Sequence, residues 1–247
     1  MLCRLAKHFL LAGTLALVAA FVRPEPAGAQ NIAYEQMAPL SDYLMENRHA
    51  EIDLARSAAP PAISLHATTL VLSSRGYEIA KRGTNGFTCL VERSWMSPFD
   101  SPEFWNSRMR GPICYNPPAS RTVLLYTLRR TDLALSGLRK SQIFDDITIA
   151  IAKKQLPAPQ AGSMSYMMSK DGDLGDGVGP WLPHLMVYAP KAAGANDGAS
   201  WGADLPTCPV LLDTSHRAVP EPETIFMIPV AHWSDGRPGP EPTSHRR

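Results

Sequence analysis

The chain has 247 residues, 45% of them hydrophobic, and a formal net charge of +1 at pH 7. Residues 1–29 hold three of its 24 Lys and Arg residues and one of its 23 Asp and Glu residues, so the remainder has a formal net charge of −1. Because nucleic-acid and anionic-membrane binding proteins depend on an excess of basic residues, we expect neither kind of partner.

The N-terminus has the pattern of an export signal. Arg4 and Lys7 precede an apolar run over residues 9–22, and "AGA" at residues 27–29 offers small side chains to a signal peptidase. The run is too short for an ordinary membrane span, although an uncleaved N-terminal anchor is the alternative. We expect cleavage after residue 29, a periplasmic or secreted location, and no membrane span in the rest of the chain.

The length that remains after cleavage suits a single domain with its own hydrophobic core. We assign residues 1–29 to a signal peptide and residues 30–234 to one domain. Residues 235–247 are polar and rich in proline, which predicts a disordered tail.

The first half of the domain is expected to begin with a helix over residues 39–58, where apolar side chains recur at helical spacing. Strand-like runs follow at residues 68–74, 76–82 and 87–95. The sequence "GTNG", residues 83–86, separates the last two runs, and Asn-Gly between two β-prone segments predicts a hairpin.

Two helices are expected in the middle of the chain, over residues 117–138 and 140–156, because the apolar positions continue at helical spacing. Residues 122–127 also have strand-like composition, so a strand is the alternative there. Four short apolar runs then alternate with Gly, Pro and Asp clusters, which is typical of strands. Helix, strands, helices, strands is the order of an α+β fold. We therefore predict a mostly antiparallel sheet with helices packed on one face.

Three cysteines follow the signal region: Cys89, Cys114 and Cys208. Export would place them where disulfides persist, and three cysteines allow one bridge and one free thiol. We favour a Cys89–Cys114 disulfide, because each residue lies in a short apolar run and the loop between them is modest. A redox or nucleophilic cysteine is the alternative, but the chain contains no C-x-x-C motif.

The stretch "DGDLGDGVG" places three carboxylates, Asp171, Asp173 and Asp176, in a glycine-rich loop. Alternate carboxylates on a flexible backbone can wrap Ca²⁺, so these residues are the candidate metal ligands. The match to a helix-loop-helix calcium loop fails at its twelfth position, which falls on Leu182 instead of glutamate. Because Asp and Gly are also the commonest turn formers, our first choice is no cofactor, with calcium as the alternative.

His184 is the candidate catalytic residue. It begins an apolar run directly after the acidic loop, where it could act as a general base oriented by an aspartate. A hydrogen-bonded structural histidine is the plainer interpretation. A zinc site that draws on His184, His216 and His232 is a further alternative, although their spacing fits no short zinc motif.

Two side-chain groups have a structural and a functional interpretation. The first is aromatic and forms either a buried cluster, which we favour, or an exposed binding surface: Trp95, Phe99, Phe104 and Trp105. The second is rich in thioethers and forms either adaptable core, which we favour, or a Cu(I) site: Met164, Met167, Met168 and Met186.

Several common catalytic motifs are missing from the sequence. It holds no H-E-x-x-H, no Walker A loop and no G-x-G-x-x-G between a strand and a helix, and its one match to G-x-S-x-G, at residues 198–202, has no strand-like run before it. We therefore predict a non-enzymatic protein that binds a small ligand or a protein partner. The alternative, which the sequence leaves open, is a hydrolase or metal-dependent enzyme that uses His184 with the Asp171–Asp176 loop.

Several runs together carry a resemblance: "NGFTCLVERSW", "GPICYNPPASR", "MSYMMSK", "WLPHLMVYAP", "SWGADLP" and "WSDG". With these runs the chain resembles a family of exported bacterial proteins of unknown function. The resemblance extends over most of the chain after the signal region. It implies one domain and an extracytoplasmic location, and it implies no catalytic residues.

Overall fold

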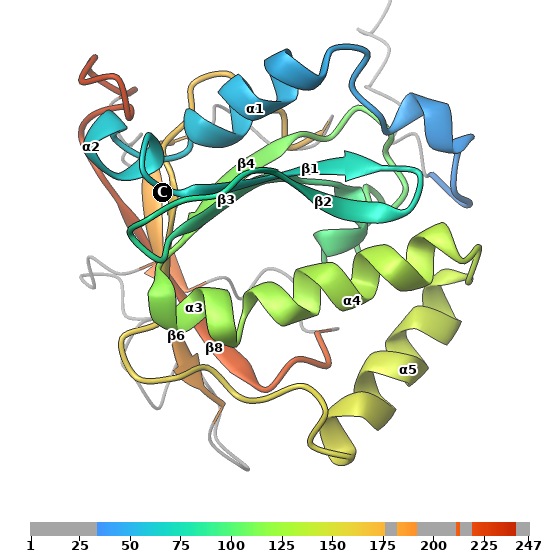
Figure 1. Ribbon diagram of the computed structural model, residues 1–247. Helices are drawn as coiled ribbons and strands as arrows, with labels where there is room; N and C mark the ends of the chain where they lie inside the picture. Colours follow the sequence, from blue (N-terminus) through green and yellow to red (C-terminus); the bar gives the residue numbers. More distant parts are fainter. Residues whose placement is uncertain (1–33, 176–181, 192–210, 213–218, 241–247) are drawn as a thin grey trace, which may run out of the picture. The chain divides into compact units, whose positions relative to one another are not determined.

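A computed structural model of the chain describes residues 34–175, 182–191, 211–212 and 219–240 (Figure 1). All of these residues belong to one compact unit, Asn31–Arg247. The predicted signal peptide, Asp176, Cys208 and His216 lie outside the described residues.

The described helices and strands follow the predicted order along the chain. The helical segments are η1 (Leu40–Asp42), α1 (Arg48–Arg56), α2 (Pro61–Ser64), η2 (Ser94–Met96), α3 (Pro117–Arg121), α4 (Leu124–Leu135) and α5 (Lys140–Ala152). The strands are β1 (Thr68–Ser73), β2 (Gly76–Lys81), β3 (Thr88–Glu92), β4 (Gly111–Tyr115), β5 (Met164–Met167), β6 (His184–Pro190), β7 (Leu211–Leu212) and β8 (Glu223–Pro229).

The strands form one sheet in the order β2-β1-β3-β4-β5-β6-β8-β7. Among the described strands, β1 and β3 run parallel and all other neighbours run antiparallel. The predicted α+β class and mostly antiparallel sheet are therefore confirmed.

The helices cover both faces of the sheet, and not one face as predicted. Figure 1 shows α1 on one side of strands β1 to β4 and α4 on the opposite side. The reason is that alternate positions of the central strands are apolar on both sides. Leu90 and Ile113 join a core with α4 and α5, whereas Val91 joins a second core with α1.

The helix predicted over residues 39–58 is interrupted, since only η1 and α1 are helical there. Asn47 caps α1, because its Oδ1 accepts hydrogen bonds from the backbone N–H groups of His49 and Ala50. The residues before the cap are held by tertiary contacts instead. Tyr43 is fully buried, its hydroxyl donates to the carbonyl of Trp105 at 2.8 Å, and its own carbonyl accepts from Arg93 Nε.

The hairpin predicted at residues 83–86 is wrong. The strand β2 pairs with β1 through the tight turn after Ser73, and β3 pairs with β1 on its other side. The Asn85 amide explains the difference, because it donates to the carbonyl of Ile63 at 2.8 Å and so attaches the loop to α2. Gly83 also lies so close to β1 that a Cβ there would be 2.2 Å from the backbone nitrogen of Thr68.

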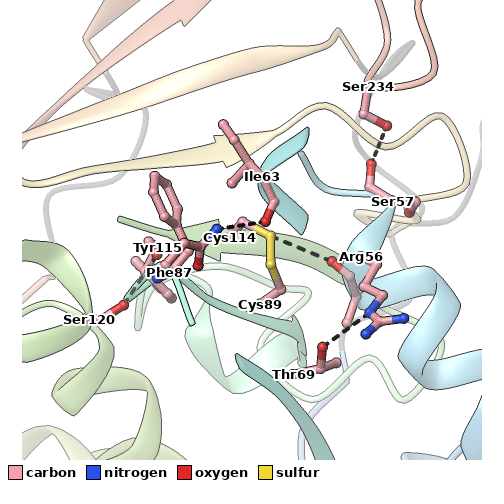
Figure 2. Close-up of a disulfide and its surroundings, with 12 residues drawn as sticks. Arg56, Ser57, Ile63, Thr69, Phe87, Cys89, Cys114, Tyr115, Ser120 and Ser234 are labelled. Carbon is pink, nitrogen blue, oxygen red and sulfur yellow. Dashed lines mark hydrogen bonds between the residues drawn. A yellow bond between two sulfur atoms is a disulfide. The ribbon is translucent and has the colours of Figure 1, made fainter. Parts of the chain in front are cut away.

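The predicted disulfide is confirmed. Cys89 lies directly opposite Cys114 in the antiparallel register of β3 and β4, and a disulfide joins the two. Both side chains are fully buried in a small core that includes Ala55 of α1 and Val91 of β3. Figure 2 shows the disulfide in this small core, with Ile63 of α2 beside it. The disulfide therefore joins two central strands.

The first part of the predicted tail is folded. Residues 235–240 form a turn in which Trp233 donates to the carbonyl of Arg237 and Gly239 donates to that of Ala231. These backbone hydrogen bonds extend the domain past residue 234, and residues 241–247 lie outside the described part. Within the described residues, the structure contains no helix with the length and apolar character that crossing a bilayer requires.

Candidate functional site

A cavity of about 400 Å³ opens between α4 and the sheet. We call it the α4 cavity. Its walls come from the ends of β3 and β4, from the segment after η2, from α4, and from β5, β6 and β8. Segments far apart in the sequence therefore meet around one space, as is usual for small-molecule sites.

The alternation of the strands explains which side chains face the α4 cavity. Successive side chains of a strand point to opposite faces, so every second residue of β6 and β8 contributes to the wall. Met186 lies opposite Met227 and Tyr188 lies opposite Ile225 in the β6–β8 register, and all four line the cavity. The wall on this side is consequently a continuous patch of the sheet.

Most of the lining is apolar and adaptable. Five thioethers contribute to it: Met96, Met109, Met167, Met186 and Met227. Three phenol rings add flat surfaces: Tyr115, Tyr126 and Tyr188. Methionine fills irregular spaces and accommodates ligands of different shape, and aromatic rings offer large contact areas. Such a wall suits an organic molecule with an apolar body.

A buried ion pair forms one end of the α4 cavity. Arg130 of α4 donates to Glu221 from two of its three guanidinium nitrogens, from Nε to Oε1 at 2.6 Å and from Nη2 to Oε2 at 2.7 Å. Its remaining Nη1 donates to the carbonyls of Trp95 and Ser97, and the guanidinium lies 4.3 Å from the centre of the Phe99 ring. Each guanidinium nitrogen of Arg130 thus has a hydrogen-bond acceptor, so the ion pair is a fixed part of the cavity wall.

Glu92, at the end of β3, is held by two hydroxyl groups. Its Oε1 accepts hydrogen bonds from Tyr115 at 2.6 Å and from Thr127 at 2.8 Å. Burial raises the pKa of the Glu92 carboxyl, and the two hydroxyl donors oppose that rise. The carboxyl is therefore both oriented and inclined to keep its proton.

Glu223, the first residue of β8, has the most unusual environment. Its Oε2 is buried and has no hydrogen-bond partner among the described residues. Burial, helped by the negative charge of Glu221 and opposed by Arg130, raises the pKa of Glu223 well above its ordinary value. A buried acceptor without a donor is unfavourable, so this carboxyl is a candidate contact for a ligand.

The other charged side chains around the cavity have partners in the protein. Arg93 Nη2 lies 2.8 Å from Glu51 Oε1, and both side chains are buried. Glu103 Oε2 accepts a hydrogen bond from the side-chain amide of Asn106 at 2.6 Å. Among the described lining residues, Glu92 and Glu223 are the carboxyls that have neither a cation nor an amide as partner.

His184 is placed in the wall of the α4 cavity, where it lies opposite Met167 of β5. The ring is buried, and its Nδ1 lies 2.7 Å from the carbonyl of Leu182. Because a carbonyl only accepts, Nδ1 carries a proton, which places the lone pair of the neutral ring on Nε2. His184 is the first residue of a strand, as the sequence predicted, and its catalytic role stays a prediction.

Asp171 and Asp173 are exposed and do not line the α4 cavity. Asp173 Oδ1 accepts a hydrogen bond from the N–H of Gly175, which is an Asx turn, and its backbone pairs with Arg110. Gly175 has φ +99°, and a Cβ there would meet Glu103 Oε2 at 2.4 Å. This part of the acidic loop therefore has a structural explanation as a turn against residues 103–106.

The predicted metal ligands do not meet in the described residues. No group of three or more His, Cys, Asp or Glu side chains within that part of the chain is arranged to hold a metal ion. Asp176 and His216 lie outside it, and His232 is exposed. The calcium and zinc alternatives consequently stay predictions.

The aromatic core interpretation agrees with the structure, and the methionine core interpretation agrees for three of the four residues, whereas Met164 is half-buried and joins neither core. All four aromatic residues are buried in the larger core: Trp95, Phe99, Phe104 and Trp105. Of the methionines, Met167 and Met168 are buried, and Met186 packs against the same core while also facing the cavity.

Glu92, Arg130, Glu221 and Glu223 were not found from the sequence. A usable signal existed for two of them. In "ETIFMIP" a glutamate occupies the same alternate face as Ile225 and Met227, and in α4 Arg130 shares the buried side of the helix with Tyr126. A charge on an apolar face indicates either a buried partner or a ligand.

Comparison with known proteins identifies no relative, since no protein family, curated protein or solved structure matches the chain. The resemblance to exported bacterial proteins therefore stays a prediction.

Proposed function

We propose that this chain is a binding protein for a small organic molecule that occupies the α4 cavity. The observation that carries the proposal is the cavity itself, whose volume of about 400 Å³ is within the range of ligand sites. Its walls combine a mostly apolar surface with a few oriented polar groups, which is the composition that fixes both affinity and orientation. This function agrees with the non-enzymatic binding role predicted from the sequence.

A neutral apolar dye tests the proposal directly. The dye N-phenyl-1-naphthylamine fluoresces strongly when it leaves water, and we expect the purified chain to bind it at one site. Ile225→Trp would place a large ring in the α4 cavity and should abolish the binding. Ile149→Trp, at an exposed position of α5, is the matched control and should leave it unchanged. Equal dye binding by both variants would refute the site.

We also propose that the protein acts outside the cytoplasm. The export pattern at the N-terminus supports this location, and the buried disulfide agrees with it because disulfides persist in oxidising compartments. Cell fractionation followed by N-terminal sequencing tests it. The expected product begins at Gln30, and a cytoplasmic protein with residues 1–29 intact would refute the location.

An enzyme is the second candidate, because His184 lines the same cavity as Glu92 and Glu223. A histidine and carboxyls around one space could perform acid–base chemistry on a bound molecule. The test is hydrolysis of short 4-nitrophenyl esters and phosphates by the wild-type chain and by His184→Gln. Activity that His184→Gln loses while it still binds the dye would favour the enzyme, and no activity in either would refute it.

A further inference from the structure

The ion pairs among the described residues around the α4 cavity leave two carboxyls without a cation, and this narrows the class of ligand. Arg130 is neutralised by Glu221 and Arg93 by Glu51. Within the described lining, Glu92 and Glu223 are carboxyls with no cationic partner. A ligand that brings a positive charge would complete the set, whereas an anionic ligand would face two carboxyls.

Glu223 marks the place in the α4 cavity where a cation would bind. Its Oε2 is buried, lines the same wall as Ile225, and has no donor among the described residues. An ammonium group supplies the donor and the charge in one contact, and charge-assisted hydrogen bonds are the strong ones. Because burial has already removed water from this oxygen, the contact gains more here than it would at the surface.

The rest of the wall suits the body of such a molecule. Tyr115, Tyr126 and Tyr188 add aromatic rings to a methionine-rich surface, and both groups interact favourably with cations or with apolar chains. Glu92, oriented by Tyr115 and Thr127, offers a second carboxyl toward the same space. An apolar, aromatic wall with two carboxyls suits an amphipathic amine.

We propose that the α4 cavity binds a small organic cation, an amine with an apolar or aromatic body, whose ammonium group donates to Glu223. This inference rests on the proposed binding function and specifies its ligand class. A divalent metal ion is a poorer fit, because the described residues contain no cluster of three carboxylate, histidine or cysteine ligands. The geometry supports the assignment, since Glu223 Oε2 is buried without a hydrogen-bond donor among the described residues and an ammonium group would supply one.

Three probes with one skeleton test the ligand class: 4-phenylbutylamine, 4-phenylbutanol and 4-phenylbutanoate. They present a cation, a neutral hydroxyl and an anion on the same body at pH 7. Calorimetric titration of the wild-type chain should show the amine binding at least about 10-fold more tightly than the alcohol, with the acid weakest. An alcohol or an acid that binds as tightly as the amine would overturn the ligand class and leave the binding function intact.

Glu223→Gln then tests the residue. It should reduce the preference for the amine over the alcohol to within about 3-fold, while the affinity for the alcohol changes little. Glu78→Gln removes a partly exposed carboxyl of β2 that does not line the α4 cavity, and it is the matched control, which should keep the full preference. An unchanged preference in Glu223→Gln would overturn the assignment of this residue. If none of the probes and no neutral dye binds the wild-type chain, both the inference and the proposed function are refuted.

Discussion

Replacing Arg130 with methionine removes a buried charge that joins α4 to the segment before β8. Its partner Glu221 is 91 residues away in sequence, and both side chains are only 2% exposed. Breaking such a pair by removing one member costs about 3–5 kcal/mol, because the other charge stays buried without compensation. The two carbonyl contacts of Nη1 are lost as well, so the larger part of that range is expected.

The measurement is urea unfolding of Arg130→Met, Glu221→Gln and the double variant, followed by tryptophan fluorescence. We expect each single variant to lose about 3–5 kcal/mol. The double variant should lose clearly less than the sum, which corresponds to a coupling free energy of at least about 2 kcal/mol. The reason is that the double variant leaves no unpaired charge behind.

Arg129 supplies the control, because it is adjacent in sequence and pairs with Asp146 of α5 at the same short distance of 2.6 Å. Both of those side chains are about one third exposed or more. We therefore expect the pair Arg129→Met and Asp146→Asn to show a coupling below about 1 kcal/mol. If the two cycles gave equal couplings, the argument that burial decides the strength of these pairs would be refuted.

Three further changes test other parts of the structure. Replacing Cys89 and Cys114 with serine opens a bridge of sequence separation 25, and urea unfolding should show a loss of about 3.5 kcal/mol that reductant reproduces in the wild type. Gly83→Ala places a carbon 2.2 Å from the backbone of β1 and should lose more than about 2 kcal/mol in the same assay, whereas Gly111→Ala meets nothing closer than 3.6 Å and should lose far less. Folding raises the pKa of Glu223 above its ordinary value of 4.5, so the free energy of unfolding should fall as the pH rises above about 4.5, and Glu223→Gln should reduce that fall. An equal pH dependence in both proteins would contradict the buried carboxyl.

The elements that the sequence predicted well are those set by local periodicity. The helix α5 follows the 3.6-residue spacing of its buried residues, and β6 and β8 follow from short apolar runs. The disulfide was also predicted, since Cys89 and Cys114 each lie in a short apolar run, and the structure places them opposite each other in β3 and β4. In each case the pattern and the packing favour the same structure.

The features that the sequence did not predict depend on contacts between distant residues. Asn85 and Gly86 have the composition of a hairpin, but the Asn85 amide bonds to Ile63, and β1 takes the place beside β3. The helix predicted over residues 39–58 is interrupted before α1, because Tyr43 is buried and its hydroxyl donates to the carbonyl of Trp105. A local pattern carries no information about such partners, so composition alone favoured the wrong structure.

The α4 cavity could not be predicted for the same reason. Its charged groups, Arg130 and Glu221, become partners only when α4 packs across the sheet, and Glu223 is recognisable only once its oxygen is seen to be buried. The sequence did predict His184 as a candidate residue at the start of an apolar strand, and the structure shows that it lines the cavity from the same side of β6 as Met186 and Tyr188.

Stability and binding together distinguish a ligand contact from a structural residue at Glu223. A residue that supports the fold lowers the free energy of unfolding when it is replaced. Glu223 has an unpaired buried oxygen and a raised pKa, so Glu223→Gln is expected to raise stability at neutral pH. The same change is expected to reduce the preference for an amine. If Glu223→Gln gains stability and loses selectivity, the carboxyl contacts the ligand and lowers the stability of the fold. If Glu223→Gln loses both stability and selectivity, Glu223 is a structural residue of the cavity wall.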